Sequence, residues 1–225
     1  MNYLISAFKA TDDLELCLAY KKGHLKVLED YGITNVSSNN EDWFFDDQVY
    51  ALVVKDLDSN EVLGGARLHV YNGFNIMPIQ EAIGYLDAKI EDILKAELPH
   101  KTGEACGLWN AKKAWGLGLG ALLTTAIVAY SSRSGLKSVF ALSAKYTKDM
   151  IMARGFEVVH EVGDNGDFIY PIESHRATVL KYPNLADPSR ANDYEKSRIL
   201  SLVDQPNQTF NEQINGRILS VSYNL

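Results

Sequence analysis

The chain contains little cysteine: among its 225 residues only Cys17 and Cys106 occur, far apart in the sequence. Two distant cysteines cannot form a disulfide framework, and no C-x-x-C spacing indicates a metal site. The five histidines are scattered, with no pair four residues apart, so the sequence predicts no bound metal ion. This scarcity favours a reduced, cytoplasmic compartment.

An excess of basic residues is missing as well. The formal net charge is −7 and the pI is about 5.2, which argue against nucleic acid as a partner. Residues Met1–Ile5 lack the basic-then-apolar order of a signal peptide. The uncharged stretch Ala114–Tyr130 begins with three glycines spaced two apart, a poor start for a bilayer helix. We therefore expect a buried loop and helix there, and no membrane span.

The composition is that of a globular domain, with 46% hydrophobic and 23% charged residues. Leucines at positions 14, 18, 25 and 28 recur near helical spacing and predict a helix over Asp12–Tyr31. Further helices are predicted at Leu86–Leu98, from a glycine loop to about Arg133, and at Thr147–Arg154. Strands are predicted at Gln48–Val54, Glu61–Val70, Glu104–Asn110, Lys137–Ser143, Gly155–Glu161, Phe168–Ile172 and Ala177–Tyr182.

Helices and strands alternate from Glu104 onward, which predicts an α/β fold with a mixed sheet. Past Pro183 the composition changes, and Asn, Asp, Ser and Gln become frequent. We therefore predict a domain over residues 1–182 and an appendage over 183–225, packed on the domain or on a partner. In the appendage, Arg198–Val203 predicts a helical turn or two, and Arg217–Tyr223 a late strand.

The sharpest signal is a strand, a glycine loop and a helix over Gly107–Leu123, which reads G-L-W-N-A-K-K-A-W-G-L-G-L-G-A-L-L. A helix N-terminus carries free N–H groups and partial positive charge, and glycines let a phosphate approach the backbone. Lys112 and Lys113 stand at the mouth of this loop. A P-loop would need Gly-Lys-Ser/Thr here, and a dinucleotide fingerprint would need its third glycine one residue later. The alternative is tight helix–sheet packing without a ligand.

This loop resembles that of the GNAT acetyltransferase superfamily, whose pattern Q/R-x-x-G-x-G/A holds the CoA pyrophosphate on backbone amides. Two registers fit, Lys113–Gly118 and Trp115–Gly120, and both stay open. The resemblance continues through the strand Ser138–Ser143 to the pair Gly155-Phe156. It implies a mixed, mainly antiparallel sheet flanked by helices and split where CoA enters. It also implies that CoA is bound by Leu108, Trp109, Asn110, Lys113, Trp115, Gly116, Leu117, Gly118, Leu119 and Gly120.

A narrower resemblance is to the acyl-homoserine-lactone synthases. It rests on W-F-F-D-D-Q-V-Y at Trp43–Tyr50, G-G-A-R-L at Gly64–Leu68, and E-A-C at Glu104–Cys106. That family's strand usually continues Glu-x-Ser-Arg, so this chain departs from it at Gly107. The resemblance implies site roles for Asp46, Asp47, Arg67 and Glu104. The aromatic residues Trp43, Phe44 and Phe45 line a substrate pocket or pin a loop to the core.

Glu104 is the candidate catalytic residue, a general base that takes a proton from an amine. Such a role needs a pKa raised by burial, and the alternative is a solvated carboxylate at a strand start. Many GNAT enzymes place a tyrosine four residues before the Gly-Phe pair to protonate the leaving thiolate. Here that position is Ile151, and Tyr146 is a weak substitute. Arg67 faces a substrate or forms a surface salt bridge.

These observations predict an acyl-CoA-dependent N-acyltransferase. The acyl donor would be acetyl-CoA, a longer acyl-CoA or a carrier-protein thioester, and the acceptor a small-molecule amine. Acyl carrier protein is thus a candidate partner, and a homodimer is left open. The alternatives are an autoinducer synthase of the acyl-homoserine-lactone type and a GNAT-fold protein that binds acyl-CoA without turnover.

Overall fold

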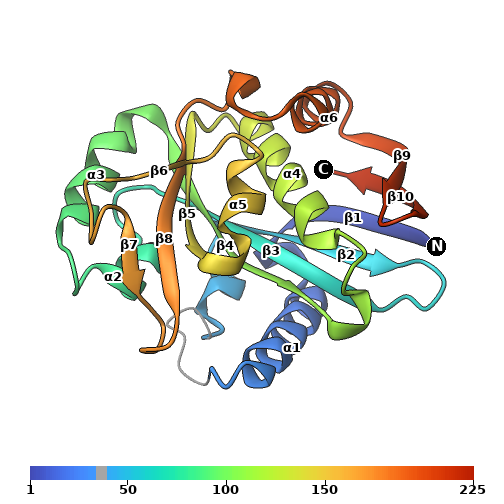
Figure 1. The fold of residues 1–225 in the computed structure, drawn as a ribbon, viewed down its shortest axis with the longest axis horizontal. Coiled ribbons are helices and arrows are strands. Elements are labelled where there is room, and N and C mark those ends of the chain that lie inside the picture. The colour runs from blue at the N-terminus through green and yellow to red at the C-terminus, as the bar shows by residue number, and fades with distance from the viewer. Residues whose placement is uncertain (34–39) are drawn as a thin grey trace.

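One mixed β-sheet runs through the computed structural model, which describes residues 1–33 and 40–225 (Figure 1). Its strands are β1 (Asn2–Lys9), β2 (Val49–Asp56), β3 (Val62–Val70), β4 (Thr102–Asn110), β5 (Ser138–Ala144), β6 (Glu157–Val158), β7 (Asp167–Ile169), β8 (Arg176–Tyr182), β9 (Asn207–Ile214) and β10 (Arg217–Asn224). They follow the order β6-β8-β5-β4-β3-β2-β1-β10-β9, and β7 pairs with β8. The paired strands are antiparallel except for β4 with β5 and β1 with β10. The mixed, mainly antiparallel sheet is thus confirmed.

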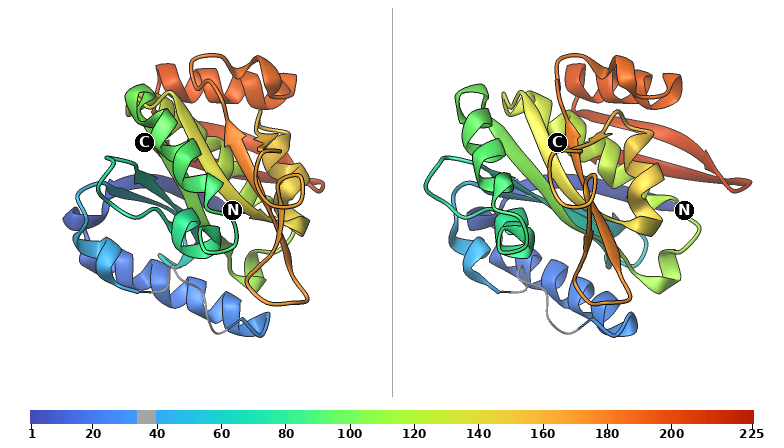
Figure 2. Two further views of the ribbon diagram at one scale, coloured as in Figure 1. Left: turned by 90° about the vertical axis from the view of Figure 1, so that its left-hand side faces the viewer. Right: turned by 60° about the vertical axis from the view of Figure 1, so that its left-hand side comes forward.

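Helices cover both faces of this sheet. They are α1 (Leu14–Asp30), α2 (Pro78–Ile83), α3 (Lys89–Glu97), α4 (Leu119–Arg133), α5 (Lys145–Met152) and α6 (Asp193–Asp204). Figure 2 shows α1 and α6 on opposite sides of the sheet. Because successive strand residues point to opposite faces, Leu52 and Val54 of β2 pack under α4, while Ala51 and Val53 pack under α1. Among the described residues, no helix combines the length and apolar character that crossing a membrane requires.

The helix predicted at Asp12–Tyr31 is present as α1, but its leucines do not form its buried face. Leu14 and Leu18 are 43% and 51% exposed, whereas Cys17, Tyr20 and His24 are buried against the sheet. Leucine spacing alone was therefore a poor guide, because aromatic and sulfur-bearing side chains form this face. Gly23 lies in the middle of the contact, where a Cβ atom would come within 2.0 Å of the Trp109 ring. The glycine that weakens the helix in the sequence is required by this packing.

Strands β4 and β5 pair only at their beginnings. The parallel register joins Thr102 to Ser138, Gly103 to Val139 and Glu104 to Phe140, and then the two strands diverge. On its other edge, β4 has a bulge opposite Ala66, where Gly107 takes a φ of +58°. A bulge bends a strand and strengthens its twist. The split sheet implied by the sequence is therefore present between β4 and β5.

Residues 183–225 extend the same sheet. Strand β10 pairs in parallel with β1, and β9 pairs with β10 through a turn at Asn215 and Gly216, both with positive φ. Such a turn suits the twist of a two-residue hairpin. The predicted late strand at Arg217–Tyr223 is confirmed. The predicted helical turn at Arg198–Val203 is part of the longer α6. Asn192 caps the N-terminus of α6, because its side-chain oxygen accepts a hydrogen bond from the Glu195 N–H.

Three elements were not predicted from the sequence: β1, α2 and β9. The other predicted helices and strands are present with boundaries shifted by a few residues, although two of the strands are reduced to the short β6 and β7. For the polar and acidic stretch Val36–Asp47 the sequence predicts a loop, and this stretch begins outside the described residues. Its described part contains a short 3-10 turn at Asp42–Phe45.

Candidate active site

A cleft of about 180 Å³ lies where β4 and β5 part. Strand β4 lines it from Glu104 to Leu108, and β5 from Ala141 to Ala144. Because neither strand has a partner across this gap, its backbone and side chains face an open space between the two halves of the sheet. Helices from both faces close the cleft with His24, Pro78, Ala82, Tyr146, Thr147 and Ile151, and the loop after β7 adds Tyr170.

Glu104 stands at the point where the two strands separate. It is 1% exposed, and its carboxylate accepts a hydrogen bond from the Ile79 N–H in the first turn of α2 at 2.8 Å. Burial raises the pKa of Glu104 to about 8, although this hydrogen bond and the charge of Arg67 oppose the shift. The alternative of a solvated carboxylate is therefore wrong. Glu104 is instead a buried carboxyl group whose pKa lies near neutrality.

Besides its tyrosines and Glu104, the cleft is lined by two further titratable groups, His24 and Cys106. Burial lowers the pKa of His24 to about 3, so its imidazole is neutral, and burial raises the pKa of Cys106 to about 12. A thiol with that pKa is a poor nucleophile. Cys106 is therefore an inert wall of the cleft, and Glu104 is the group in it best suited to exchange a proton at neutral pH.

The glycine loop turns into α4 close to the end of β4. Gly116 and Gly118 have φ values of +76° and +67°, and Gly118 is the N-cap residue of α4. The first intrahelical bond runs from the Leu122 N–H to the Gly118 carbonyl oxygen at 3.1 Å. With the Asn110 amide turned over into the orientation that satisfies both of its ends, its side-chain oxygen accepts a hydrogen bond from the Gly120 N–H at 3.0 Å. The N–H groups of Leu119 and Ala121 remain as donors at a helix N-terminus, which suits an anion.

The order of these parts along the chain is decisive: a strand, a glycine loop, a helix, and then a parallel strand that splits away from the first. The model of the acetyltransferase (GNAT) family matches residues 15–156, well over half of the chain. The chain belongs to the GNAT family. No curated protein matches it in sequence.

Solved structures with the same fold include acyl-transferring enzymes. FeeM, an N-acyl amino acid synthase from uncultured soil microbes, is 13% identical with a TM-score of 0.62, over 82% of this chain and 98% of that one. BjaI, a CoA-dependent acyl-homoserine lactone synthase, is 11% identical with a TM-score of 0.55, over 99% and 95%. A putative N-acetyltransferase from Lactobacillus plantarum is 14% identical with a TM-score of 0.54, over 80% and 97%. At these identities the likeness shows the fold alone.

The GNAT loop residues named from the sequence separate into different surroundings. The Leu117 and Leu119 side chains are buried in the core, so only their backbones are available to a ligand. Trp115 is 57% exposed beside the loop. The Leu108 side chain lines the cleft, but the Trp109 side chain points to α1 and lines a different hollow. Lys113 lines that same hollow and pairs with Glu61.

The acidic and aromatic segment before β2 lies largely away from the cleft. Asp46 accepts a hydrogen bond from the Gln48 N–H at 2.8 Å, and Asp47 accepts one from the Gln48 side chain at 2.9 Å. Phe45 is 71% exposed. None of these three residues lines the cleft. Their contacts are those of a turn that leads into a strand.

Trp43 and Phe44, in contrast, are buried and hold Arg67. The Arg67 guanidinium lies 4.7 Å from the centre of the Trp43 ring, and Trp43 packs edge-on against Phe44 at 4.5 Å. Arg67 is 1% exposed, so the alternative of a surface salt bridge is wrong. Its β3 position is paired with Cys106 of β4, two residues from Glu104. The arginine therefore supplies a fixed positive charge behind the cleft.

The position of the GNAT tyrosine is occupied by Ile151, which is 7% exposed and lines the cleft. Tyr146 also lines the cleft, but it is 67% exposed and its ring stacks on Tyr31 of the segment after α1 at 5.9 Å. Sequence reasoning missed the cleft residues Pro78, Ala82, Ser143, Ala144, Thr147 and Tyr170. They carry no shared motif, and only the folding of the sheet brings them together.

Proposed function

We propose that this protein is an N-acyltransferase that moves an acyl group from an acyl-CoA, or from a carrier-protein thioester, to a small-molecule amine. The observation that carries the proposal is the opening between β4 and β5, which has a buried carboxyl group, Glu104, at its closed end. The α4 N-terminus lies at the other end of β4. An acyl thioester with a phosphate-bearing tail needs both features, one at each end of a strand.

The α4 N-terminus would hold the pyrophosphate through the N–H groups of Leu119 and Ala121. This arrangement favours the register Trp115–Gly120, because it places the last two glycines of the motif at the N-cap and in the first turn of α4. Beyond Glu104, β4 has no partner on the side of β5, so its backbone would hydrogen-bond the pantetheine arm. Catalysis then consists mainly of positioning, because a thioester is already activated.

In the transfer step, the amine nitrogen forms a bond to the thioester carbon and the carbon–sulfur bond breaks. The amine proton goes to Glu104, and the sulfur leaves as a thiolate. Ile151 offers no proton for that thiolate. A thiol has an ordinary pKa of roughly 8.5, so the thiolate can leave without a general acid. Glu104 in its ionised form is therefore the one residue whose proton transfer this mechanism requires.

Two observations favour other members of the same fold. Ile151 in place of a proton donor favours a protein that binds acyl-CoA without turnover. Arg67 stacked on Trp43 behind Glu104 favours the acyl-homoserine-lactone type of synthase, in which an arginine and a glutamate at these motif positions are site residues. Thiol release separates the first alternative from the proposal, and a lactone product separates the second.

The pyrophosphate assignment is tested at Ala121, which lies in the first turn of α4 and is half-buried. Ala121→Glu should weaken CoA binding about tenfold, because a carboxylate would face the diphosphate. Ala121→Lys is the matched control, of similar size and opposite charge, and should bind CoA at least as tightly as the wild type. A glutamate near a helix N-terminus does not harm the helix. Calorimetry with CoA measures both; equal affinity for the two variants would refute the loop assignment.

Gly118 is a worse place for this test. Its φ is +67°, and a Cβ atom there would lie 2.8 Å from the Ile214 side chain. A substitution at Gly118 would therefore disturb the packing of the C-terminal hairpin together with the ligand site.

Activity is tested by mixing the protein with acetyl-, octanoyl- and palmitoyl-CoA, and with acyl carrier protein, across a panel of amines. Free thiol should appear only when both an acyl donor and an amine are present. Binding of acyl-CoA without thiol release from any pair would leave the non-catalytic alternative standing in place of the proposal.

A further inference from the structure

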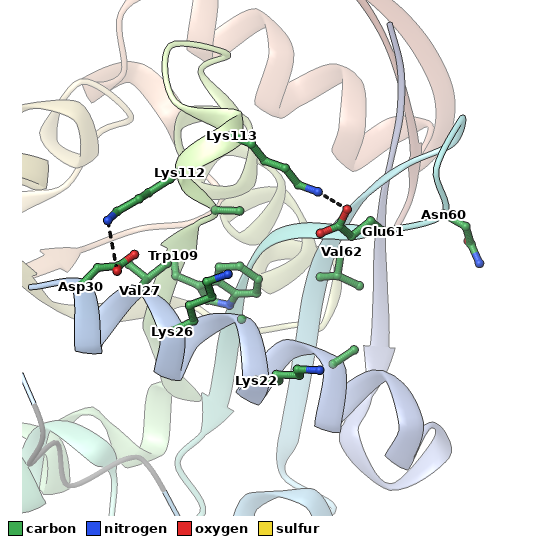
Figure 3. A pocket seen from close by; sticks show the side chains of 13 residues that line it. Lys22, Lys26, Val27, Asp30, Asn60, Glu61, Val62, Trp109, Lys112 and Lys113 are labelled. Carbon is green, nitrogen blue, oxygen red and sulfur yellow. Dashed lines mark hydrogen bonds and ion pairs between the residues drawn. The ribbon is translucent and has the colours of Figure 1, made fainter.

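A second hollow lies on the opposite side of β4 from the glycine loop. It encloses about 720 Å³ between α1, the turn that joins β2 to β3, and the segment after β4 (Figure 3). Four lysines line it, Lys22 and Lys26 on α1 and Lys112 and Lys113 after β4. We call it the lysine hollow. It shares no lining residue with the cleft between β4 and β5.

The lysine hollow carries an excess of positive charge. Figure 3 shows Lys112 paired with Asp30 and Lys113 paired with Glu61. Within the described part of the chain, Lys22 and Lys26 form no salt bridge. Two positive charges therefore remain uncompensated in one hollow of a protein whose net charge is −7. A concave, low-dielectric wall concentrates the field of such charges toward an anion.

A side chain with a buried hydrogen-bond donor also lies in the wall of this hollow. Trp109 is 4% exposed, yet its indole nitrogen Nε1 has no acceptor within the described residues. Buried N–H groups in proteins are nearly always bonded, so an unbonded one calls for an explanation. Figure 3 shows Trp109 and Lys26 among the side chains that line the hollow. Apolar side chains of Ala19, Val27 and Val62 complete the lining.

From these features we infer that the lysine hollow is a binding site for a phosphorylated small molecule of nucleotide size. Lysine binds phosphate as a point charge, and four of the described residues that line this hollow are lysines. The volume falls within the usual range of small-molecule sites. The apolar wall accommodates a flat base or ring, and the α1 lysines bind its phosphates.

The site is distinct from the proposed acyl-donor site, because β4 separates the two. Along β4 the Trp109 side chain points to α1, while the side chain of the next residue, Asn110, points to the N-terminus of α4. Gly23, which packs on Trp109, is followed on α1 by His24, which lines the cleft. A ligand in the lysine hollow would thus lie one residue away from the active-site wall.

The test uses the three tryptophans as reporters. In a proton–nitrogen correlation spectrum, Trp43, Trp109 and Trp115 each give one indole signal. The Trp109 signal is assigned with Trp109→Phe or, should that variant not fold, by elimination with Trp115→Phe and Trp43→Phe. ADP is the probe for the lysine hollow, and CoA is the probe for the glycine loop beside Trp115. Titration of the intact protein with ADP should shift the Trp109 signal to saturation.

The matched variants are two double substitutions of exposed lysines. Lys22→Glu with Lys26→Glu should weaken ADP binding, read at Trp109, by about a hundredfold, because both unpaired charges reverse. Lys95→Glu with Lys137→Glu changes the net charge equally on other surfaces and should leave the affinity within about threefold.

Three results would overturn the inference: a Trp109 signal that does not move with millimolar ADP, an equal response in both double variants, or a response to CoA with none to ADP. The last result would assign the hollow to the acyl donor. Failure of the proposed function would be seen separately, because the Trp115 indole signal would then not shift when CoA is added.

Discussion

Two buried glutamates, Glu104 and Glu195, show how this protein treats a carboxylate in its core and in its active site. Glu195 of α6 is 6% exposed and is paired with the Arg154 guanidinium and with the Thr125 hydroxyl, which donates at 2.6 Å. Glu104 is 1% exposed and accepts one hydrogen bond, from the Ile79 N–H, while it also faces a cleft. One carboxylate is neutralised by an ion pair, and the other is not.

The difference teaches which of the two can do chemistry. A buried carboxylate with a bound cation holds its neighbours together, here α4, α6 and the segment after α5. A buried carboxylate without such a partner exchanges its proton near neutral pH, as the raised pKa of Glu104 indicates. We therefore expect substitutions at the two glutamates to have opposite signatures, one in activity and the other in stability.

The largest effect is expected for Glu104→Gln. The glutamine oxygen can still accept the Ile79 N–H, so the fold should persist, but the side chain can no longer take a proton. Turnover should fall by about 10² to 10⁴, the usual contribution of a general base, with an unchanged melting temperature. Steady-state kinetics measures the first and calorimetry the second. A variant that keeps full turnover would show that Glu104 is not the base.

Glu195→Ala should give the reverse signature. Removing one partner of a buried ion pair leaves Arg154, which is 6% exposed, without its counter-charge and should lower the free energy of unfolding by about 3–5 kcal/mol. Replacing Arg154 and Glu195 together by leucine should cost less than the single change. Urea unfolding measures both variants. An equal cost for the single and double variants would mean that the ion pair does not hold α6 to the domain.

A smaller and graded effect is expected from pH. If Glu104 is the base, turnover should rise about tenfold per pH unit below its pKa of about 8 and level off above it, and Glu104→Gln should lack this rise. The same shift affects stability. The folded state binds the Glu104 proton more tightly than the unfolded state between pH 4.5 and about 8, so this group lowers the free energy of unfolding as pH rises through that window. A turnover profile flat from pH 6 to 9 would argue against a base with this pKa.

Much of the central fold was predictable because its signals are local. The strand–glycine–helix order at Gly107–Leu123 needs only neighbouring residues, and α4 begins at Leu119, directly after its N-cap Gly118. Strand β1 was missed because its pairing with β2 and β10 joins distant segments. Helix α2 was missed because it has only six residues. The turn at Asn215-Gly216 was a local signal that would have predicted the β9–β10 hairpin.

The candidate site was less predictable than the fold. Glu104 and Leu108 were named from the sequence and line the cleft, because they lie on the strand next to the glycine loop. Asp46 and Asp47 were also named, but their carboxylates accept hydrogen bonds within a turn. A resemblance between sequences aligns positions and does not show where a side chain points. Whether any of these residues binds substrate stays a prediction. The direction in which each side chain points depends on the pairing of strands that are far apart in the sequence.

The sequence by itself determined the glycine loop and the helix after it, because both depend on residues close together in the chain. It also determined the family, whose model matches residues 15–156. Only the tertiary structure decided that Glu104 is buried with no ion pair to the described residues, that Glu195 is buried with one, and that Trp109 and Asn110 face opposite sides of β4. Burial and direction arise when strands pair and helices cover them. The pKa of a carboxyl group and the surface that a lysine faces follow from that step alone.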